Sequence, residues 1–388
     1  MTRLRILFTF SGGTGHLNPL VPIARAAQAA GHVVAVTGQP SMVATIEATG
    51  LPAIPTGTGF GDPTTRIALK ELDADREDQD LRDGFANRMA RDRAVPLLEL
   101  CAGWRPHVLV CDETDFGGMV AAERLGLPYA TVVVLAAGSL VRPALLAETL
   151  DQVRAEHGLP ADPQLAMLSR YLVLSPFPPS FRDPAFPLPA TAHSIRPQAR
   201  RRDQAPGWMS RLTGAPVVYF TLGTVFNLES GDLFERVLAG LRTLPVNLVA
   251  TVGRQIDPAE LGPQPPNVHI EQYVPQEALL PYCDAVVSHG GSGSVIGALT
   301  HGVPMVLAPM GADQPHNAAR CEQLGVARVL DALRATPEDA RAAVSTVLAD
   351  RGYRRAAERL RDEIAALPGP ARAVGLLERL AAEKRPIR

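Results

Sequence analysis

Several features that would assign the chain to other protein classes are missing from the sequence. The chain has four cysteines, with no CxxC pair among them, and each lies in or beside an apolar stretch: Cys101, Cys111, Cys283 and Cys321. This pattern is typical of buried free thiols in a reducing compartment, and not of a disulfide framework or a zinc site. Lysine and arginine (38) nearly balance aspartate and glutamate (40). No basic field is therefore available to hold a nucleic-acid backbone, and we expect no nucleic-acid partner.

Long apolar runs are missing as well. The longest, residues 129–141, contains Gly138 and Ser139 and is shorter than the ~20 residues that span a bilayer. The apolar run 6–10 near the start is too short for a signal-peptide core and is typical of a buried strand. The sequence therefore predicts a cytoplasmic protein with no membrane insertion.

Apolar residues are nevertheless abundant, at 46% against 20% charged residues, which is typical of a packed globular chain. A length of 388 residues predicts two domains of roughly 150–200 residues each. Short buried strands alternate with helices in both halves, which predicts parallel sheets covered on both faces. We expect an α/β protein with two Rossmann-like, doubly wound domains facing across a cleft, and ligands at the carboxyl ends of the strands.

The predicted domain boundaries follow shifts in composition. Residues 176–206 are rich in proline and then in arginine and are predicted to be a linker. This divides the chain into an N-terminal domain (1–200), a C-terminal domain (201–365) and a C-terminal helix (366–388), for which the N-terminal domain is the expected packing surface. Residues 57–93 include the acidic run 71–80 and are predicted to be an exposed, mobile excursion.

The strongest local motif is His-Gly-Gly-Ser-Gly-Ser at residues 289–294, between the predicted strand 285–288 and a helix. Glycines let a ligand approach the backbone closely, and the free amides at a helix start suit a diphosphate. The side chains of His289, Ser292 and Ser294 add hydrogen-bond donors, whereas the Lys-Ser/Thr of a Walker loop is missing. The alternative is a plain turn with a serine cap.

A second polar pair follows one strand later. Asp313 and Gln314 lie at a strand-to-helix turn, on the sheet edge that carries the glycine-rich motif. Adjacent carboxylate and amide groups match the hydroxyls of a sugar, although an aspartate before a helix is also a common cap.

Together these motifs resemble the donor-binding signature of family 1 glycosyltransferases with the GT-B fold. The matching runs are Tyr273-Val-Pro-Gln, His289-Gly-Gly-Ser-Gly-Ser, Gly302-Val-Pro-Met and Asp313-Gln-Pro-His-Asn, with Thr221-Leu-Gly-Thr and Gly15-His-Leu-Asn-Pro earlier in the chain. Within that family the chain is most similar to actinomycete enzymes that glycosylate macrolides, enediynes and other natural products. The likeness covers nearly the whole chain and is strong from about residue 215 to 330.

The resemblance implies a nucleoside-diphosphate sugar as donor substrate and no cofactor or metal. It implies diphosphate contacts from Thr224, His289, Gly291, Ser292, Gly293 and Ser294, base contacts near Val274, and sugar contacts from Asp313 and Gln314. Asp73 and Asp75 spell the DxD that some sugar transferases use to hold a metal, but they lie in a charge run and not at a strand end. The acceptor is expected to be small and largely apolar. The candidates to contact it, with core packing as the alternative for each, are Phe60, Phe85, Met89 and Phe116.

The same resemblance places a general base at His16 and its orienting carboxylate at Asp112. A helix N-terminus disfavours the imidazolium form and a partner carboxylate favours it, so His16 is expected to be neutral and basic near neutral pH. The acceptor oxygen would then attack the anomeric carbon with inversion, and amides at the helix start would stabilise the leaving diphosphate.

One departure from the family pattern bears on the donor base. Relatives that use uridine donors carry a glutamate that holds both ribose hydroxyls, at the position occupied here by Gly297. A plant-type tryptophan is also missing near Tyr273 and Val274. We therefore expect a TDP-deoxysugar donor in preference to a UDP-sugar.

Other functions remain as alternatives. A UDP-sugar transferase, a nucleotide-sugar epimerase of GT-B fold and an inactive nucleotide-sugar-binding partner protein each fit part of the pattern. A dinucleotide-dependent oxidoreductase does not, because residue 18 is Asn18 where its fingerprint requires a third glycine. The sequence leaves open whether the protein is a monomer or a homodimer.

Overall fold

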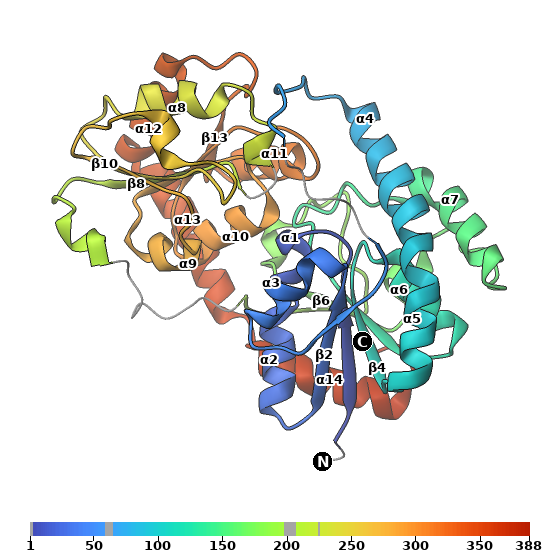
Figure 1. Ribbon diagram of the computed structural model, residues 1–388. Helices are drawn as coiled ribbons and strands as arrows, with labels where there is room; N and C mark the ends of the chain where they lie inside the picture. Colours follow the sequence, from blue (N-terminus) through green and yellow to red (C-terminus); the bar gives the residue numbers. More distant parts are fainter. Residues whose placement is uncertain (1–2, 59–64, 198–206, 224–225) are drawn as a thin grey trace. The chain divides into compact units, whose positions relative to one another are not determined.

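The structure is a computed structural model that describes residues 3–58, 65–197, 207–223 and 226–388. The chain divides into two compact units. The first unit comprises Met1–Asp62, Ala74–Gln198 and Leu367–Arg388, and the second comprises Pro63–Asp73 and Ala199–Ala366. The C-terminal helix thus belongs to the first unit, and a short segment from the first half of the sequence belongs to the second (Figure 1).

The first unit is built on a seven-stranded parallel sheet of order β3-β2-β1-β4-β5-β6-β7. Its strands are Arg5–Thr9 (β1), Val33–Gly38 (β2), Ala53–Pro55 (β3), Val108–Asp112 (β4), Tyr129–Val132 (β5), Leu172–Ser175 (β6) and Ala192–Ser194 (β7). Strand β7 lies inside the segment predicted to be a linker, so that prediction is wrong for residues 192–194. A proline-rich segment is tolerated there because β7 is an edge strand, where one side needs no ladder hydrogen bonds.

The helices of the first unit lie along both faces of this sheet. They are Thr14–Leu17 (α1), Val21–Ala29 (α2), Val43–Glu47 (α3), Ala74–Gln79 (α4), Ala90–Trp104 (α5), Phe116–Arg124 (α6), Pro143–Glu156 (α7) and Pro370–Glu383 (α14), with short 3-10 turns at Pro40–Met42, Ala166–Leu168 and Pro179–Phe181. The helical segment that follows β1 is interrupted after Leu17, where α1 ends, and α2 begins at Val21 with Pro22 in its first turn.

Alternate side chains of the central strand explain why the sheet is covered twice. Ile6 and Phe8 pack in one core cluster with residues of α2 and α14, whereas Leu7 packs in another with residues of α5 and α6. Figure 1 shows α14 beside α2, and the two helices are in contact. The last residues of the chain therefore complete the core of the first domain.

The acidic segment 57–93 differs from its prediction. Residues 74–104 form a continuous helical stretch, α4 followed by a π-helical segment at Asp80–Met89 and then α5. Leu81, Ala86 and Met89 are buried on its inner side. Their spacing was hidden in the sequence because a π-helix does not repeat with the 3.6-residue period of an α-helix.

The second unit has a six-stranded parallel sheet of order β10-β9-β8-β11-β12-β13. Its strands are Val217–Thr221 (β8), Asn247–Thr251 (β9), Val268–Glu271 (β10), Ala285–Ser288 (β11), Met305–Leu307 (β12) and Ala327–Val329 (β13). Its helices are Leu233–Leu241 (α8), Gln276–Leu279 (α9), Ser292–Thr300 (α10), Gln314–Gln323 (α11), Pro337–Ala349 (α12) and Arg351–Ala366 (α13), with 3-10 turns at Gly207–Arg211, Phe226–Leu228, Pro258–Leu261 and Leu280–Tyr282. The strand predicted over residues 285–288 and the helix predicted after it are confirmed as β11 and α10.

Segment 65–73 is fastened to the second unit at several points. The Ile67 amide donates to the Leu228 carbonyl at 2.8 Å, and Leu69 packs against the apolar core of that unit. Arg66 pairs with Glu260 at 2.6 Å. The chain therefore joins the second unit at Pro63–Asp73, returns to the first unit, and joins the second unit again at Ala199–Ala366 before the C-terminal helix returns to the first.

Both sheets have a topological switch point, where strand order reverses. It lies between β1 and β4 in the first sheet and between β8 and β11 in the second. Ligands of doubly wound proteins bind at the carboxyl ends of the strands at such points. The candidate ligand-binding loops are therefore those that follow β1, β4, β8 and β11.

The packing of α14 gives the first testable prediction. Leu377 is fully buried in the core between α14 and the sheet, so Leu377→Ala should lower the free energy of unfolding by ~2–5 kcal/mol, as large-to-small changes in cores do. Leu125→Ala, at a leucine exposed on the surface of the same unit, is the control and should change it by less than ~0.5 kcal/mol. Chemical unfolding of both variants measures the difference. Equal effects would mean that α14 does not complete the core.

Candidate active site

His16 lies just after β1, at the switch point of the first sheet. Gly12 precedes it with φ +115°, and a Cβ at Gly12 would stand 2.7 Å from His16 Cδ2. Glycine is therefore required for the loop to fold under the imidazole. The helix that carries His16, α1, has only four residues, so the dipole effect expected from a long helix beginning here is small.

Asp112 faces His16 from the end of β4. Its Oδ1 lies 3.5 Å from His16 Nδ1, and the Thr114 hydroxyl lies 3.1 Å from the same nitrogen. The Asp112 side chain is fully buried, whereas that of His16 is 20% exposed. The structure thus brings together the predicted base and the predicted carboxylate, and adds Thr114 as a bridge between them.

The backbone of two loops holds the Asp112 carboxylate in place. The Ser11 amide donates to Oδ2 at 2.7 Å. The amide and hydroxyl of Thr114 both donate to Oδ1 at 2.6 Å. A buried carboxylate needs such donors to offset the loss of water, and they fix the oxygen that faces His16.

A buried ion pair supports this arrangement. Arg93 from α5 and Asp115 from the N-terminus of α6 meet at 3.0 Å, both almost fully buried. Asp115 also accepts hydrogen bonds from the Thr9 and Ser11 hydroxyls and from the Gly118 amide. Burial would raise the pKa of Asp115, but Arg93 and these donors outweigh burial and lower the pKa. The pair joins α5 and α6 to the loop whose amide holds Asp112.

Sequence analysis missed Arg93 and Thr114. Thr114 could have been found, because it is a hydroxyl residue two positions after a strand-ending aspartate, where its side chain and amide can both reach that carboxylate. Arg93 gave no such signal, since it lies in a segment predicted to be exposed.

The predicted acceptor residues have different environments. Phe85 is half-buried and its ring stacks on His16, with centroids 5.7 Å apart. Met89 is buried, and Phe116 is fully buried in the core of the first unit. Phe60 lies outside the described residues. Phe85 is therefore the member of this set that the structure brings beside the predicted base.

A second carboxylate, Glu113, directly follows Asp112 and was also missed by sequence analysis. It is buried, and its Oε1 accepts a hydrogen bond from the Leu135 amide at 2.9 Å. Burial raises the pKa of Glu113 to about 7, against the opposing effects of Arg182 and of that amide. The signal in the sequence was a pair of adjacent carboxylates directly after a buried strand.

In the second unit, His289 is half-buried beneath the glycine-rich loop after β11. A Cβ at Gly223 or Gly291 would lie 2.7 Å or 2.6 Å from its ring, and the ring of Phe226 stacks on it at 6.2 Å. Burial lowers the pKa of His289 to about 4, so the imidazole is neutral at neutral pH. Within the described part of the chain, its buried Nδ1 has no hydrogen-bond partner.

The amides of the loop open α10. Gly290 has φ +87°, which favours glycine, and Gly291 is the N-cap of the helix. Ser292, Gly293 and Ser294 occupy the first turn of α10. The Ser294 amide donates to the Gly291 carbonyl at 3.0 Å, and the Ser292 amide donates to Asp313. These residues could hold a phosphate group. Thr224, predicted to join them, lies outside the described residues.

Asp313 and Gln314 follow β12 and connect to this loop. Asp313 Oδ2 accepts from the Ser292 amide at 3.1 Å and the Ser292 hydroxyl at 2.6 Å. Gln314 is buried, and its Oε1 accepts from the Met310 amide at 2.8 Å. Both side chains thus support the loops, in addition to the sugar contact predicted for them.

Asn317, one turn into α11, ties the same elements together. Its Nδ2 donates to the Gly290 carbonyl at 3.0 Å and to Asp313 at 2.8 Å. The residue is fully buried. It belongs to the Asp313-Gln-Pro-His-Asn run, so the motif contained it although no role was predicted for it.

The region predicted to meet the base lies after β10. Val274 is buried, and the guanidinium of Arg254 lies 4.0 Å above the exposed ring of Tyr273. At Gly297 a Cβ would stand 3.0 Å from Gln276 Nε2, which donates to the Gly293 carbonyl at 3.2 Å. The Gln276 side chain therefore occupies the space that a larger residue at 297 would need.

Comparison with known proteins identifies the class of enzyme to which this chain belongs. Residues 25–186 match the erythromycin biosynthesis protein CIII-like N-terminal domain, and residues 235–380 match the C-terminal domain of the same family. The chain is 32% identical to 4'-demethylrebeccamycin synthase of Lentzea aerocolonigenes, over 97% of this chain and 99% of that protein. It is 30% identical to tylactone mycaminosyltransferase of Streptomyces fradiae, over 98% and 93%.

The chain therefore belongs to the erythromycin biosynthesis protein CIII-like family of glycosyltransferases. Among solved structures, the spinosyn rhamnosyltransferase SpnG with thymidine diphosphate aligns with a TM-score of 0.81 at 28% identity, over 97% of this chain and all of that one. The glycosyltransferase SnogD from Streptomyces nogalater aligns with a TM-score of 0.75 at 27% identity, over 98% of this chain and all of that one. The predicted GT-B fold is confirmed.

The described residues show neither a metal-ion cluster nor a membrane-spanning helix. In the described ranges, no group of three or more histidine, cysteine, aspartate or glutamate side chains is arranged to hold a metal ion. None of the helices in the same ranges combines the length and the apolar character needed to cross a bilayer. Asp75 lies in α4, and Asp73 lies in the segment that belongs to the second unit.

The environment of Glu113 predicts a pH dependence of stability. The pKa is raised from 4.5 to about 7, so the folded state binds the proton more tightly than the unfolded state, and stability falls as pH rises from about 4.5 to 7. Glu113→Gln removes this loss. Relative to wild type, the variant should gain up to ~3 kcal/mol of unfolding free energy between pH 5 and pH 8.

Urea unfolding at both pH values measures the gain. Glu99→Gln, at an exposed position on α5, is the control and should give a difference from wild type that is the same at pH 5 and pH 8. A Glu113→Gln difference that is equally independent of pH would contradict the burial argument.

Proposed function

We propose that this chain is an inverting, metal-independent glycosyltransferase that moves a deoxysugar from a TDP-sugar to a hydroxyl of a small, largely apolar natural product. The observation that carries the proposal is the His16–Thr114–Asp112 arrangement at the switch point of the first sheet. A base with an orienting carboxylate is what a transferase needs to activate an acceptor hydroxyl.

In the proposed mechanism, His16 takes the acceptor proton. Asp112 and Thr114 face Nδ1, which favours the tautomer with its proton on that nitrogen and leaves the lone pair on Nε2. Nε2 accepts the hydroxyl proton while the oxygen attacks the anomeric carbon from the side opposite the diphosphate. The configuration at that carbon is therefore inverted, and Asp112 stabilises the imidazolium that forms.

The second unit would bind the donor and stabilise the leaving group. Charge on the departing diphosphate would be stabilised at the start of α10 by the Gly293 amide and the Ser294 hydroxyl, and by an N–H of the neutral His289. Because His289 is neutral, it acts as a hydrogen-bond donor and not as a fixed positive charge. Asp313 and Gln314 would contact the sugar, as the resemblance implies.

Two observations support thymidine over uridine in the donor. Position 297 is glycine, so the carboxylate that holds both ribose hydroxyls in uridine enzymes is missing here. Named relatives point the same way: a TDP-daunosamine transferase of Streptomyces peucetius is 28% identical, and SpnG was solved with thymidine diphosphate. For the acceptor, relatives are named for tylactone and 10-deoxymethynolide.

The base can be tested by His16→Ala. The variant should lose at least ~100-fold in turnover, the scale of general-base catalysis, while its affinity for TDP stays within about twofold of wild type, because the predicted donor residues belong to the second unit. Turnover is measured as TDP released from a TDP-sugar with an accepted natural-product aglycone, and affinity by calorimetry. His157→Ala, at the end of α7, is the matched control and should behave as wild type. Equal loss of TDP affinity and turnover in His16→Ala would assign His16 a structural role.

The donor can be tested without knowing the acceptor. TDP, UDP and NAD are added separately at equal concentration and the thermal unfolding midpoint is measured. A ligand at a hundred times its dissociation constant stabilises the folded state by ~2.7 kcal/mol, which is a measurable shift. We expect TDP to stabilise more than UDP, and NAD to have no effect. UDP giving the larger shift would keep the transferase and overturn the thymidine assignment; a response to NAD alone would overturn both.

A further inference from the structure

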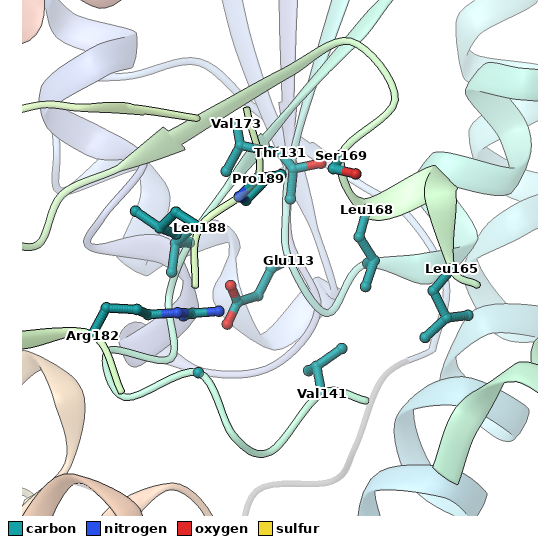
Figure 2. A pocket seen from close by; sticks show the side chains of 12 residues that line it. Glu113, Thr131, Val141, Leu165, Leu168, Ser169, Val173, Arg182, Leu188 and Pro189 are labelled. Carbon is teal, nitrogen blue, oxygen red and sulfur yellow. The ribbon is translucent and has the colours of Figure 1, made fainter. Parts of the chain in front are cut away.

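A pocket of about 200 Å³ lies within the first unit, between β5, β6 and the loops that follow them (Figure 2). Its wall is mostly apolar, with contributions from Val133, Val141, Leu165, Leu168, Val173 and Leu188. A cavity of ~150 Å³ accommodates benzene, whereas pockets for whole drug-sized ligands have ~300–1,000 Å³. This pocket therefore has room for one or two rings of a larger ligand.

Two charged side chains face each other across this apolar wall. Figure 2 shows the Arg182 side chain extended toward the Glu113 carboxylate. Neither belongs to the residues that the proposed mechanism uses. Glu113 nevertheless follows Asp112 directly in the chain, so the pocket begins at the same end of β4 as the His16 site.

The backbone of Leu135 fixes both charged groups. Its amide donates to Glu113 Oε1 at 2.9 Å, and its carbonyl accepts from Arg182 Nη1 at 3.2 Å. Arg182 Nε also donates to the Phe186 carbonyl at 2.8 Å. With these bonds made, the second oxygen of Glu113 can still accept a hydrogen bond and the second amino group of Arg182 can still donate one.

Gly138 shows that the position of Arg182 is built into the fold. A Cβ at Gly138 would overlap the guanidinium, at 1.9 Å from Cζ, and its φ is +89°. Any other residue would displace Arg182 and strain the turn. The sequence thus keeps a glycine where the guanidinium must lie against the backbone.

The two charges restrict the ligand chemistry. An ammonium group on the ligand would be attracted by Glu113 but repelled by Arg182, and a carboxylate would be attracted by Arg182 but repelled by Glu113. A neutral hydroxyl meets neither repulsion and can donate to Glu113 and accept from Arg182 at once. A ring without such a group would leave the second oxygen of Glu113 and the second amino group of Arg182 without partners in an apolar pocket, which is costly.

We infer that this pocket binds a neutral, hydroxylated ring of the acceptor, with Glu113 and Arg182 as the residues that select the hydroxyl. The inference rests on the proposed transferase function and names part of its substrate class. Glu113 and Arg182 act here in binding and specificity, apart from proton transfer by His16.

The test uses 2-naphthol as probe, because its two rings match the pocket in size and it carries one hydroxyl. Its methyl ether, 2-methoxynaphthalene, cannot donate a hydrogen bond, and 2-naphthoate carries a negative charge. Binding of each to the full-length protein is measured by calorimetry without nucleotide. We expect 2-naphthol to bind at least tenfold more tightly than either analogue, since a buried acceptor rejects a ligand that lacks its donor.

Variants show where the probe binds. Glu113→Leu should weaken 2-naphthol at least tenfold and leave 2-methoxynaphthalene within about twofold, whereas Glu99→Gln should change neither. Leu168→Trp fills the apolar part of the pocket and should weaken both probes, which keeps the test decisive if Glu113→Leu fails to fold. A cooperative thermal unfolding transition without ligand checks that each variant is folded.

The outcomes separate the two proposals. If TDP stabilises the protein and 2-naphthol binds no better than its ether, or binds equally to Leu168→Trp, the pocket assignment is wrong and the transferase proposal stands. If 2-naphthoate binds most tightly, Arg182 dominates and selection of a neutral hydroxyl is overturned. If 2-naphthol behaves as expected and TDP gives no shift, the pocket binds hydroxylated rings but the donor assignment fails.

Discussion

The first unit depends on one buried carboxylate, that of Asp112. A fully buried aspartate is destabilising unless hydrogen-bond donors replace the water that it has lost. Here the donors are the Ser11 amide and the amide and hydroxyl of Thr114. Meeting this requirement fixes the loops after β1 and β4 in a single arrangement, and that arrangement places His16 against the carboxylate. The same hydrogen bonds therefore satisfy a buried charge and orient the proposed base.

The Arg93–Asp115 pair extends this constraint into the core. Ser11 links the two carboxylates, because its amide donates to Asp112 and its hydroxyl donates to Asp115. Ser11 thus anchors the loop after β1 through both its backbone amide and its side-chain hydroxyl. A fold that supports many acceptors can vary its apolar loops freely as long as this polar connection between β1, β4, α5 and α6 stays in place.

In the second unit, too, a carboxylate holds two loops together through hydrogen bonds. Ser292 donates twice to Asp313, and Asn317 connects Asp313 to the carbonyl of Gly290. The loops after β11 and β12 are thereby fixed before any ligand arrives. In the proposed function, donors held in place in this way, such as the Gly293 amide, would need no reorganisation when charge develops on the leaving diphosphate.

The sequence was sufficient to predict what depends on local patterns. Alternation of buried strands with helices predicted the two parallel sheets, and the glycine-rich run at 289–294 predicted a loop closing on a helix start. Gly290, which takes positive φ, lies in the run 289–294 that sequence analysis had singled out. The resemblance paired His16 with Asp112. This pairing agrees with a parallel sheet, in which neighbouring strands bring their carboxyl ends to one edge.

What the sequence could not predict depends on contacts between distant segments. The π-helical segment hid the buried face of residues 80–89, so Arg93 could not be placed beneath the site. Glu113 and Arg182 are 69 positions apart in the sequence, and both are hydrogen-bonded to the backbone of Leu135. No spacing rule connects a carboxylate after one strand to an arginine in a proline-rich segment that looked like a linker.

Burial shifts the pKa values of one residue in each unit in opposite directions, and in both cases it disfavours the charged form. It raises the pKa of Glu113 to about 7 and lowers the pKa of His289 to about 4, because desolvation disfavours whichever form is charged. His289 is thereby kept as a neutral donor beneath a loop suited to a diphosphate, and Glu113 is held near the point where it can donate or accept. Neither group adds a full charge of its own at neutral pH. In the proposed function, recognition in both places would rely on directed hydrogen bonds in apolar surroundings, which discriminate between ligands by the position of single hydroxyl or phosphate oxygens.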